Sequence, residues 1–325
     1  MLSRERARQI LNNIRDRNIV VLGDVMLDEF VWGDVTRISP EGPVPVVDVR
    51  RESIHLGGAA NVLANLVSLG ACGSVVGVIG NDRAGEQLRS TLRRLRSNAD
   101  EGLVVDESRP STIKTRIVAH SQLVVRADRE LRTPVNRAIE DEIISRLKVA
   151  LSRADAFVVS DYDKGAVTPH VLNAILGFAY ERMPVLIDPK MRNLAFYRPA
   201  TLITPNHLEA LRMSNTEEDS DGGLHHAATL IRERLGCDAV LITRGDRGMM
   251  LLEHVSPPVY VETAAREVYD VTGAGDTVIA ALAGGLAAGA SMIEAATFAN
   301  HAAGIVVGKV GTATATASEL IATFD

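Results

Sequence analysis

A short glycine-rich stretch constrains the fold of this chain more than any other part of it. Residues 267–288 read EVYDVTGAGDTVIAALAGGLAA, a polar segment that passes through Gly273 and Gly275 and continues as small apolar residues. Glycine permits a tight turn, and the uncharged run after Asp276 predicts a buried helix. The first turn of such a helix presents unpaired backbone N–H groups at the positive end of the helix dipole. The stretch therefore predicts a site for a phosphate or a developing negative charge.

Two carboxylates flank this turn and differ in character. Asp276 would lie in the first helical turn, where a carboxylate is stabilised and can also act as a general base. Asp270, six residues earlier, could with Thr272 orient the loop or hold a monovalent cation such as K⁺. A Gly-x-Gly before a helix is also often only a tight loop with an acidic cap. These residues alone leave the structural and the catalytic interpretations open.

Composition and charge exclude several classes of protein. The chain has 325 residues, 46% of them hydrophobic and 23% charged, which is typical of a soluble globular protein. The net charge of −6 argues against a nucleic-acid-binding surface or a polybasic membrane contact. Cys72 and Cys237 lie far apart and have no zinc or disulfide spacing. The charged N-terminal segment predicts an amphipathic helix rather than a signal peptide. We expect a cytoplasmic protein with no nucleic-acid or membrane partner.

Strand and helix patterns alternate along most of the chain. A β-branched run at 18–24 predicts a first core strand, and a helix opens at 56–61. Repeated βα units predict an α/β fold with a mostly parallel central sheet and helices on both faces. The segments 31–54 and 112–128 instead predict a small antiparallel β-lid, because the first is rich in proline and both alternate in polarity. We expect one domain, 1–325, with the lid inserted in it.

Ligands on parallel sheets bind beyond the carboxyl ends of the strands. Polar clusters follow the predicted strand ends at Gly23-Asp24, Ser160-Asp161, Asp188-Pro189-Lys190, Thr204-Pro205-Asn206 and Thr243-Arg244-Gly245. Because these ends meet at one edge of the sheet, the clusters predict a single site there.

The segment Asn206-His207-Leu208-Glu209 has two interpretations. Asn206 would cap a helix with Glu209 at its third position, which is a structural role. Alternatively, both side chains lie near nucleotide phosphates and Glu209 acts on hydrated Mg²⁺, which prefers oxygen ligands and keeps waters. Thr243, Arg244 and Gly245 could contact phosphates from the next strand, although Arg244 taken alone reads as a surface residue.

A second group of residues is suited to a sugar. Gly57 and Gly58 permit close backbone approach, and Asn61 could hydrogen-bond hydroxyl groups from the helix that follows. Asp28, just after the first strand, could accept hydroxyl hydrogens. A helix cap and a solvated carboxylate are the structural alternatives. The candidates for binding a substrate phosphate are Lys164, Lys190 and Arg116.

These motifs together resemble a known family. The sequences GGAAN at 57–61, NxxE at 206–209 and DVTGAGD at 270–276 resemble, in order and spacing, the ribokinase-like (PfkB) carbohydrate kinases, over essentially the whole chain. Further stretches resemble the branch that acts on D-glycero-β-D-manno-heptose 7-phosphate: 23–45, 160–165, 188–190 and 267–314.

The resemblance implies a ribokinase-like αβα sandwich that uses ATP and Mg²⁺ and forms a homodimer through the β-lid. It implies that Asp276 removes the proton from the anomeric hydroxyl. The anion hole would be formed by the amides of Gly273, Ala274, Gly275 and Asp276. The nucleotide side would include Asn206, His207, Leu208, Glu209, Thr243, Arg244, Gly245 and Asn300. The sugar side would include Asp28, Gly57, Gly58, Asn61, Lys164 and Lys190.

The sequence departs from ribokinase itself in two places. Met26 stands where ribokinase has a substrate-binding Asn, and the spacing from the glycine pair to Asn61 is one residue shorter. Both departures argue against ribose as the substrate. Some heptose kinases are fused to a nucleotidyltransferase, and because this chain ends at Asp325 we expect the stand-alone form.

The resulting hypothesis is ATP-dependent phosphorylation of O1 of the heptose 7-phosphate, giving the 1,7-bisphosphate used for the ADP-heptose of lipopolysaccharide core. One alternative is the same chemistry on fructose 1- or 6-phosphate. Another is a catalytically silent nucleotide- or sugar-binding module. A dinucleotide oxidoreductase is a poor interpretation, because no Gly-x-Gly-x-x-Gly turn follows the first strand.

Overall fold

A nine-stranded sheet forms the centre of the molecule in the computed structural model, which describes residues 2–120, 122–253 and 257–324. Its strand order is β13-β12-β11-β10-β9-β8-β1-β4-β5, parallel from β11 to β5 and antiparallel at β12 and β13. The strands are β1 (Asn18–Gly23), β4 (Cys72–Ile79), β5 (Leu103–Val105), β8 (Ala156–Ser160), β9 (Val185–Asp188), β10 (Leu202–Ile203), β11 (Ala239–Thr243), β12 (Met249–Glu253) and β13 (Val259–Val261).

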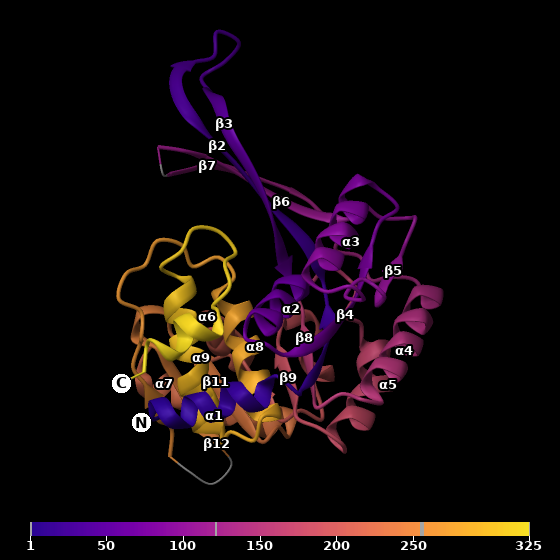
Figure 1. The fold of residues 1–325 in the computed structure, drawn as a ribbon, viewed down its shortest axis with the longest axis vertical. Helices are drawn as coiled ribbons and strands as arrows, with labels where there is room; N and C mark the ends of the chain where they lie inside the picture. The colour runs from indigo at the N-terminus through magenta and orange to yellow at the C-terminus, as the bar shows by residue number, and fades with distance from the viewer. Residues whose placement is uncertain (1, 121, 254–256, 325) are drawn as a thin grey trace.

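Helices cover both faces of this sheet, as the βα alternation predicts (Figure 1). Alternate residues of β1 pack into opposite cores, Ile19 and Val21 into one and Val20 and Leu22 into the other. The first core includes α1 (Arg4–Ile14), α2 (Ala59–Ser68), α3 (Arg83–Leu95), α8 (Ala274–Ala287), α9 (Met292–Val306) and α10 (Ala317–Ile321). The second includes α4 (Arg137–Leu151), α5 (Pro169–Tyr180), α6 (His207–Ser214) and α7 (Asp221–Leu235).

The helix predicted at the glycine-rich stretch is present as α8 and is buried on nearly all sides. Its small residues explain how it fits there. A Cβ on Gly284 would lie 3.3 Å from the side chain of Ile14 on α1, and one on Gly285 would lie 3.2 Å from Ala295 on α9. Larger residues would push the neighbouring helices apart, so the small-residue composition sets how closely α8 packs.

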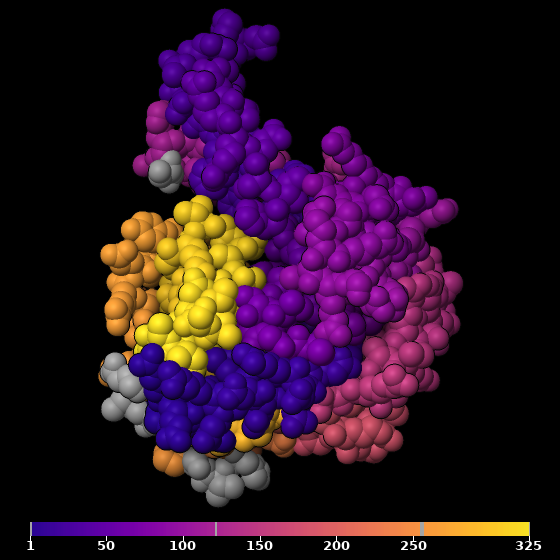
Figure 2. All heavy atoms as spheres, viewed as in Figure 1, coloured from indigo at the N-terminus to yellow at the C-terminus, as the bar shows by residue number. Residues whose placement is uncertain are grey.

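The lid is a separate four-stranded sheet with the order β3-β2-β6-β7, made of β2 (Val25–Ile38), β3 (Pro45–Gly58), β6 (Thr112–Ala119) and β7 (Gln122–Arg129). Its two outer pairs are antiparallel, whereas β2 and β6 run parallel. The first lid segment is longer than the predicted 31–54, because β2 begins directly after β1 and β3 continues into the Gly57-Gly58 pair. Figure 2 shows the outer part of β2 and β3 standing clear of the body.

The first core strand predicted at 18–24 and the helix predicted to open at 56–61 lie within a few residues of β1 and α2. The three-residue strand β5 and the five-residue helix α10 were not predicted, because each is too short to show a periodic pattern. Among the described residues, none of the helices combines the length and apolar character needed to span a bilayer.

Candidate active site

Asp276 lies in the first turn of α8, at the carboxyl edge of the central sheet. The helix is preceded by Gly273, whose φ of 80° is a left-handed conformation that favours glycine. Ala274 N donates to Val271 O at 3.2 Å, but among the described residues the amides of Gly273, Gly275 and Asp276 have no protein acceptor. Three of the four predicted N–H groups are therefore free to bind an anion next to the Asp276 carboxylate.

Both oxygens of the Asp276 carboxylate accept hydrogen bonds from other elements. Asn61 Nδ2 on α2 donates to Oδ2 at 2.9 Å, and the hydroxyl of Tyr162 donates to Oδ1 at 2.8 Å. The side chain is only 2% exposed. Burial raises the pKa of Asp276 to about 7, although the hydrogen bonds from Asn61 and Tyr162 act to lower it. A carboxylate with a pKa near neutrality is suited to general-base catalysis.

Asn61 is held from behind by a buried polar network. Asn65 Nδ2 donates to the backbone oxygen of Asn61 at 3.0 Å, and Thr277 Oγ1 donates to Asn65 Oδ1 at 3.0 Å. The network connects α2 to α8 and fixes the amide of Asn61 on the carboxylate of Asp276. The sequence predicts that Asn61 contacts sugar hydroxyls, and in the structure its Nδ2 is engaged by the candidate base.

Three of the predicted sugar-side residues, Asp28, Gly57 and Gly58, lie together at the base of the lid, whereas Lys190 lines the polar pocket described below. Asp28 on β2 is 3% exposed and lies against Gly57, where a Cβ would be 2.3 Å from Asp28 Oδ2. Gly58 has a φ of 55°, and a Cβ there would lie 3.5 Å from the ring of Tyr162. Arg116 on β6 forms an ion pair with Asp28. The absence of side chains at Gly57 and Gly58 therefore lets β3 pack closely against Asp28 and Tyr162.

On the other side of Asp276 lie two adjoining pockets with shared walls. One has a volume of about 260 Å³ and is lined mainly by polar residues: Tyr162, Asp188, Lys190, Thr204, Asn206 and Glu209. The other has a volume of about 360 Å³ and is more apolar, lined by residues that include Met249, Val268, Val307, Gly245 and Asn300. Both are bordered by Thr243, Val271, Gly275 and Val278. A polar pocket continuous with an apolar one is suited to a phosphate chain attached to a flat aromatic base.

Asn206 and Glu209 form the capping box that was the structural interpretation of their spacing. Asn206 Oδ1 accepts from the amide of Glu209 at 2.9 Å, and Glu209 Oε2 accepts from the amide of Asn206 at 3.0 Å. The other oxygen of Glu209 forms an ion pair with Lys190. Both residues also line the polar pocket, so a capping role and a role toward a ligand are compatible. His207 and Leu208 line neither pocket.

The polar pocket fits a hydrated Mg²⁺ that arrives with phosphates. It contains the carboxylates of Asp188 and Glu209. Burial raises the pKa of Asp188 well above its ordinary value; Lys190 opposes the rise and the charge of Glu209 adds to it. Nowhere in the described part of the chain do three or more His, Cys, Asp or Glu side chains group as a metal site. Mg²⁺ usually keeps several waters and takes one or two carboxylates plus substrate phosphates, which matches this donor set.

Arg244 is buried rather than on the surface, where the residue taken alone was expected. It is 9% exposed, forms an ion pair with Asp221 and lies 5.0 Å from the ring centre of Tyr260. Asn300 Nδ2 donates to Glu262 O at 2.7 Å while lining the apolar pocket. The contacts of Arg244 and Asn300 therefore help to fix the walls of the pockets on the nucleotide side of the site.

Asp270 orients the loop before α8. Its carboxylate accepts from the amides of Thr272 and Gly311, both at 2.9 Å. Burial acts to raise the pKa of Asp270, but the hydrogen bonds from Thr272 and Gly311 outweigh it and hold the pKa below its ordinary value. Nearby, the buried hydroxyl of Thr312 has no hydrogen-bond partner among the described residues. The loop-orienting interpretation is thus visible in the contacts, and a monovalent cation here stays a prediction.

Two residues of the site were given no role from the sequence. Tyr162 lies within the SDYDKG stretch, and Lys114 is one of two charged residues on β6. Nothing in their local spacing indicates that they meet Asp276, because they reach it from separate sheets. The phenol of Tyr162 contacts the carboxylate directly, and the charge of Lys114 acts to lower the pKa of Asp276.

Comparison with solved structures identifies the fold class of this chain. Solved structures that resemble it include ribokinase from Arabidopsis thaliana in complex with ribose and ATP, with a TM-score of 0.73, 18% identity and coverage of 95% of this chain and 99% of that one. Phosphofructokinase-2 from Escherichia coli in complex with substrates and products gives a TM-score of 0.75, 18% identity and coverage of 95% and 98%. The chain therefore has the ribokinase-like fold.

The sequence comparisons identify the family. The model of the pfkB family of carbohydrate kinases matches residues 16–319, and the chain belongs to this family of ATP-dependent sugar kinases. Its relatives include the bifunctional protein HldE of Pelobacter propionicus, 45% identical over 98% of this chain and 66% of the relative. The bifunctional protein HldE of Geotalea uraniireducens is 43% identical over 99% of this chain and 66% of the relative. The chain thus spans slightly less than two thirds of the length of these relatives.

Proposed function

We propose that this chain transfers the γ-phosphate of ATP to O1 of D-glycero-β-D-manno-heptose 7-phosphate, giving the 1,7-bisphosphate. The observation that carries the proposal is the position of Asp276. Its buried carboxylate, with a pKa of about 7, lies beside three free amides and between the lid side and the nucleotide side of the site. A base, an anion hole and two binding regions meet there, as phosphoryl transfer to a hydroxyl requires.

Each part of the site has a defined task in this proposal. The carboxylate of Asp276 takes the proton of the sugar hydroxyl while the hydroxyl oxygen forms a bond to the γ-phosphorus of ATP. The bond between that phosphorus and the bridging oxygen of the β-phosphate breaks, and ADP leaves. The free amides of Gly275 and Asp276 stabilise charge on the transferring group. Asp28 accepts hydrogens from sugar hydroxyls at the base of the lid. Mg²⁺ bound with the nucleotide would neutralise phosphate charge, held on the protein side by Glu209 and Asp188.

The choice of a heptose rests on sequence. The stretches 23–45, 160–165, 188–190 and 267–314 resemble the heptose 7-phosphate kinase branch, and the relatives of highest identity reported above carry the name HldE. A role in ADP-heptose and lipopolysaccharide core synthesis follows if the heptose is the substrate. Fructose 1- or 6-phosphate remains the alternative, because the site geometry supports the reaction more directly than it selects the sugar.

The proposal includes a homodimer formed through the lid, and the exposed apolar residues of the lid support it. Large apolar side chains that are at least half exposed gather on it: Ile38, Val44, Val49, Leu123 and Val125. Exposed apolar residues that cluster in this way mark interaction surfaces more often than free surface.

The deciding experiment measures ADP release with Mg·ATP across a panel of phosphorylated and free sugars. Turnover confined to the heptose 7-phosphate supports both the reaction and the substrate. Preference for a hexose phosphate keeps the kinase and discards the heptose. Silence across the panel from folded protein that binds ATP favours a binding module and contradicts the proposal.

A further inference from the structure

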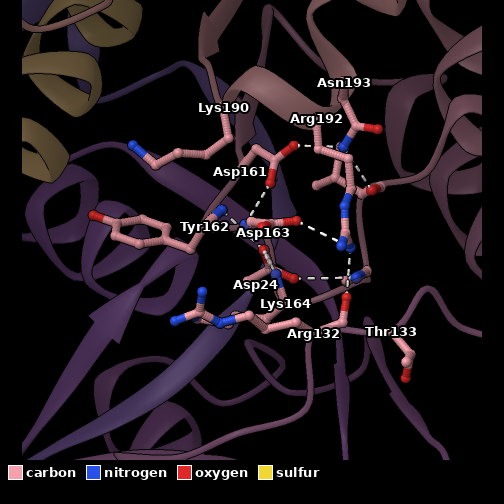
Figure 3. Close-up of polar contacts among 12 residues, drawn as sticks. Asp24, Arg132, Thr133, Asp161, Tyr162, Asp163, Lys164, Lys190, Arg192 and Asn193 are labelled. Atoms are coloured by element: carbon pink, nitrogen blue, oxygen red, sulfur yellow. Dashed lines mark hydrogen bonds and ion pairs between the residues drawn. The ribbon is translucent and has the colours of Figure 1, made fainter. Parts of the chain in front are cut away.

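Two buried carboxylates lie behind the active site and take no part in the proposed chemistry. Asp24 follows β1 and is 3% exposed, and Asp161 follows β8 and is 1% exposed. Figure 3 shows both among the polar groups that surround the turn from Asp161 to Lys164. Burying two ionisable acids is costly unless they are well satisfied. Their contacts therefore indicate what they hold in place.

Asp24 fastens the turn that carries Tyr162. Its carboxylate accepts from the backbone amides of Tyr162 at 2.9 Å, Lys164 at 3.0 Å and Ala166 at 3.1 Å. Within this turn Gly165 has a φ of 93°, and a Cβ there would lie 2.2 Å from a backbone oxygen. The turn is thus tied to the end of β1 in one conformation.

Asp161 connects the same turn to the segment between β9 and β10, which contains Asn193 and Tyr197. Its Oδ2 accepts from Asn193 Nδ2 at 2.7 Å and from the hydroxyl of Tyr197 at 2.6 Å, and its Oδ1 accepts from the amide of Asp163 at 2.7 Å. Burial and the nearby charge of Asp161 raise the pKa of Asp24 to about 6. The network is polar, buried and nearly saturated with donors, which makes the turn rigid.

The side chain held by this turn lies where the two halves of the active site meet. Figure 3 shows the ring of Tyr162 directed away from the Asp24–Asp161 pair, on the same side as Lys190. The ring centre lies 5.7 Å from the ammonium of Lys190 and 5.2 Å from that of Lys114. It also lines the polar pocket and faces Gly58. Its hydroxyl reaches Asp276 Oδ1.

We propose that Tyr162 is a positioning residue for the base Asp276, held in place by the buried Asp24–Asp161 pair. Its hydroxyl fixes one carboxylate oxygen and stabilises the ionised form that must accept the substrate proton. Burial and the charge of Asp276 raise the pKa of Tyr162 well above its ordinary value, so the phenol stays a donor at every working pH. The role rests on the proposed function only in that Asp276 is the base.

The test reads the titration of Asp276 directly and does not depend on turnover. In protein labelled with [¹³C]aspartate, the carboxyl resonance of Asp276 is assigned by its loss in Asp276→Asn and is followed against pH. Tyr162→Phe removes the hydroxyl and keeps the ring, and we expect the pKa of Asp276 to rise by about one unit. Tyr180→Phe is the matched control, because it removes a hydroxyl that donates to Asp238 at 2.9 Å on the surface.

The pH dependence of kcat/KM provides the second readout. The acid limb of this profile should shift to higher pH in Tyr162→Phe, by the same amount as the titration of the Asp276 resonance. It should stay in place in Tyr180→Phe. Asp24→Asn should shift the resonance in the same direction as Tyr162→Phe, and the double variant should shift it no further. An unchanged Asp276 titration in folded Tyr162→Phe overturns the proposal. An enzyme inactive on every sugar would contradict the proposed function while the titration still decides the role of Tyr162.

A separate observation concerns the substrate phosphate. The three predicted partners are already paired in the structure: Lys164 with Glu130, Lys190 with Glu209, and Arg116 with Asp28. Lys114 forms no ion pair with the described residues. It is half-buried on β6 in register with Asp28, and burial lowers its pKa although Asp28 opposes the change. A buried ammonium without a bound anion loses hydration that an anionic ligand would replace.

Independently of Tyr162, we propose that Lys114 binds the phosphate group that the sugar substrate already carries. This assignment rests on the proposed function, and its test separates the two. Wild type and Lys114→Met are compared at pH 8 on a phosphorylated sugar and its unphosphorylated counterpart, with Lys148→Met, an exposed lysine on α4, as the control.

We expect Lys114→Met to raise KM for the phosphorylated sugar about ten-fold or more beyond any change in KM for the free sugar. An equal rise in KM for both sugars would overturn the assignment, because the loss of affinity would then not depend on the phosphate that the substrate carries. A Lys114→Met enzyme that keeps the wild-type preference also overturns it. Wild type without any preference for phosphorylated sugars contradicts the proposed function itself.

Discussion

Gly273 and Asn61 approach each other so closely that a Cβ on the glycine would lie 2.7 Å from Asn61 Nδ2, the atom that donates to Asp276. Gly273 also has a φ of 80°, which disfavours any other residue. The position of the base therefore depends on a glycine one turn away from it.

We expect Gly273→Ala to lose most of the activity. The left-handed backbone costs about 1–2 kcal/mol of stability for alanine, and the methyl group displaces Asn61 from Asp276. Gly289→Ala is the control, because Gly289 has a φ of 82° and open space around it. Thermal unfolding should show destabilisation of both variants, at least as large in Gly273→Ala, and steady-state kinetics should show loss of kcat only in Gly273→Ala. Equal kcat in the two variants contradicts the contact argument.

Gly275→Ala should separate stability from function. Gly275 lies within α8 with nothing near its Cβ position, so alanine should stabilise the folded protein by about 0.5–1 kcal/mol. Gly275 lines both pockets, so the added methyl group would take up space on the nucleotide side, where a phosphate would bind. We expect a raised melting temperature together with lower kcat/KM for ATP. Unimpaired kcat/KM would show that the ligand does not approach this amide.

Asp276→Asn should lower kcat on the order of 10²-fold or more while nucleotide binding is largely kept. In wild type, the rate should fall below pH 7 with one titrating group, because the pKa of Asp276 is about 7 and the protonated form cannot accept the substrate proton. Steady-state rates from pH 5.5 to 9 check both statements. Turnover near the wild-type level in Asp276→Asn would exclude Asp276 as the base.

The same carboxylate makes the stability of the protein depend on pH. The pKa of Asp276 is raised from 3.8 to about 7, so between these values the folded state binds more protons than the unfolded state. The contribution of this group is greatest below pH 4 and is lost as the pH rises toward 7. Asp276→Asn removes that loss, and its melting temperature should exceed that of wild type at pH 8 by more than at pH 5. A constant difference across pH would contradict the raised pKa.

The lid makes a prediction about assembly. Leu123 is 59% exposed and lies on β7, all of whose described residues are exposed. If the lid pairs two copies, Leu123→Glu should shift the sedimentation mass from a dimer to a monomer, since a charge would be buried in the interface. Val149→Glu, an exposed apolar residue on α4, is the control and should leave the mass unchanged. A wild-type monomer at micromolar concentration would exclude the lid dimer.

The sequence by itself determined the order of the elements, the position of α8 and the glycine turn before Asp276. These depend on local patterns, because apolar periodicity and glycine conformations act over a few neighbouring residues. It also placed Asn206, Glu209 and Thr243 at strand ends that the structure gathers around one pocket. The lid strands were predicted in part, because β2 continues from β1 without a break that the sequence could show.

Only the tertiary structure decided what surrounds the carboxylate of Asp276. Asn61 reaches it from α2 and Tyr162 from the turn after β8, and no local spacing records that these three residues meet. The pKa of about 7 follows from burial, which the whole fold creates. The environment of Lys114 also depends on the tertiary structure, because the fold pairs the other three basic residues, Arg116, Lys164 and Lys190, with carboxylates. Long-range packing therefore converts a recognisable glycine turn into a base with a particular pKa.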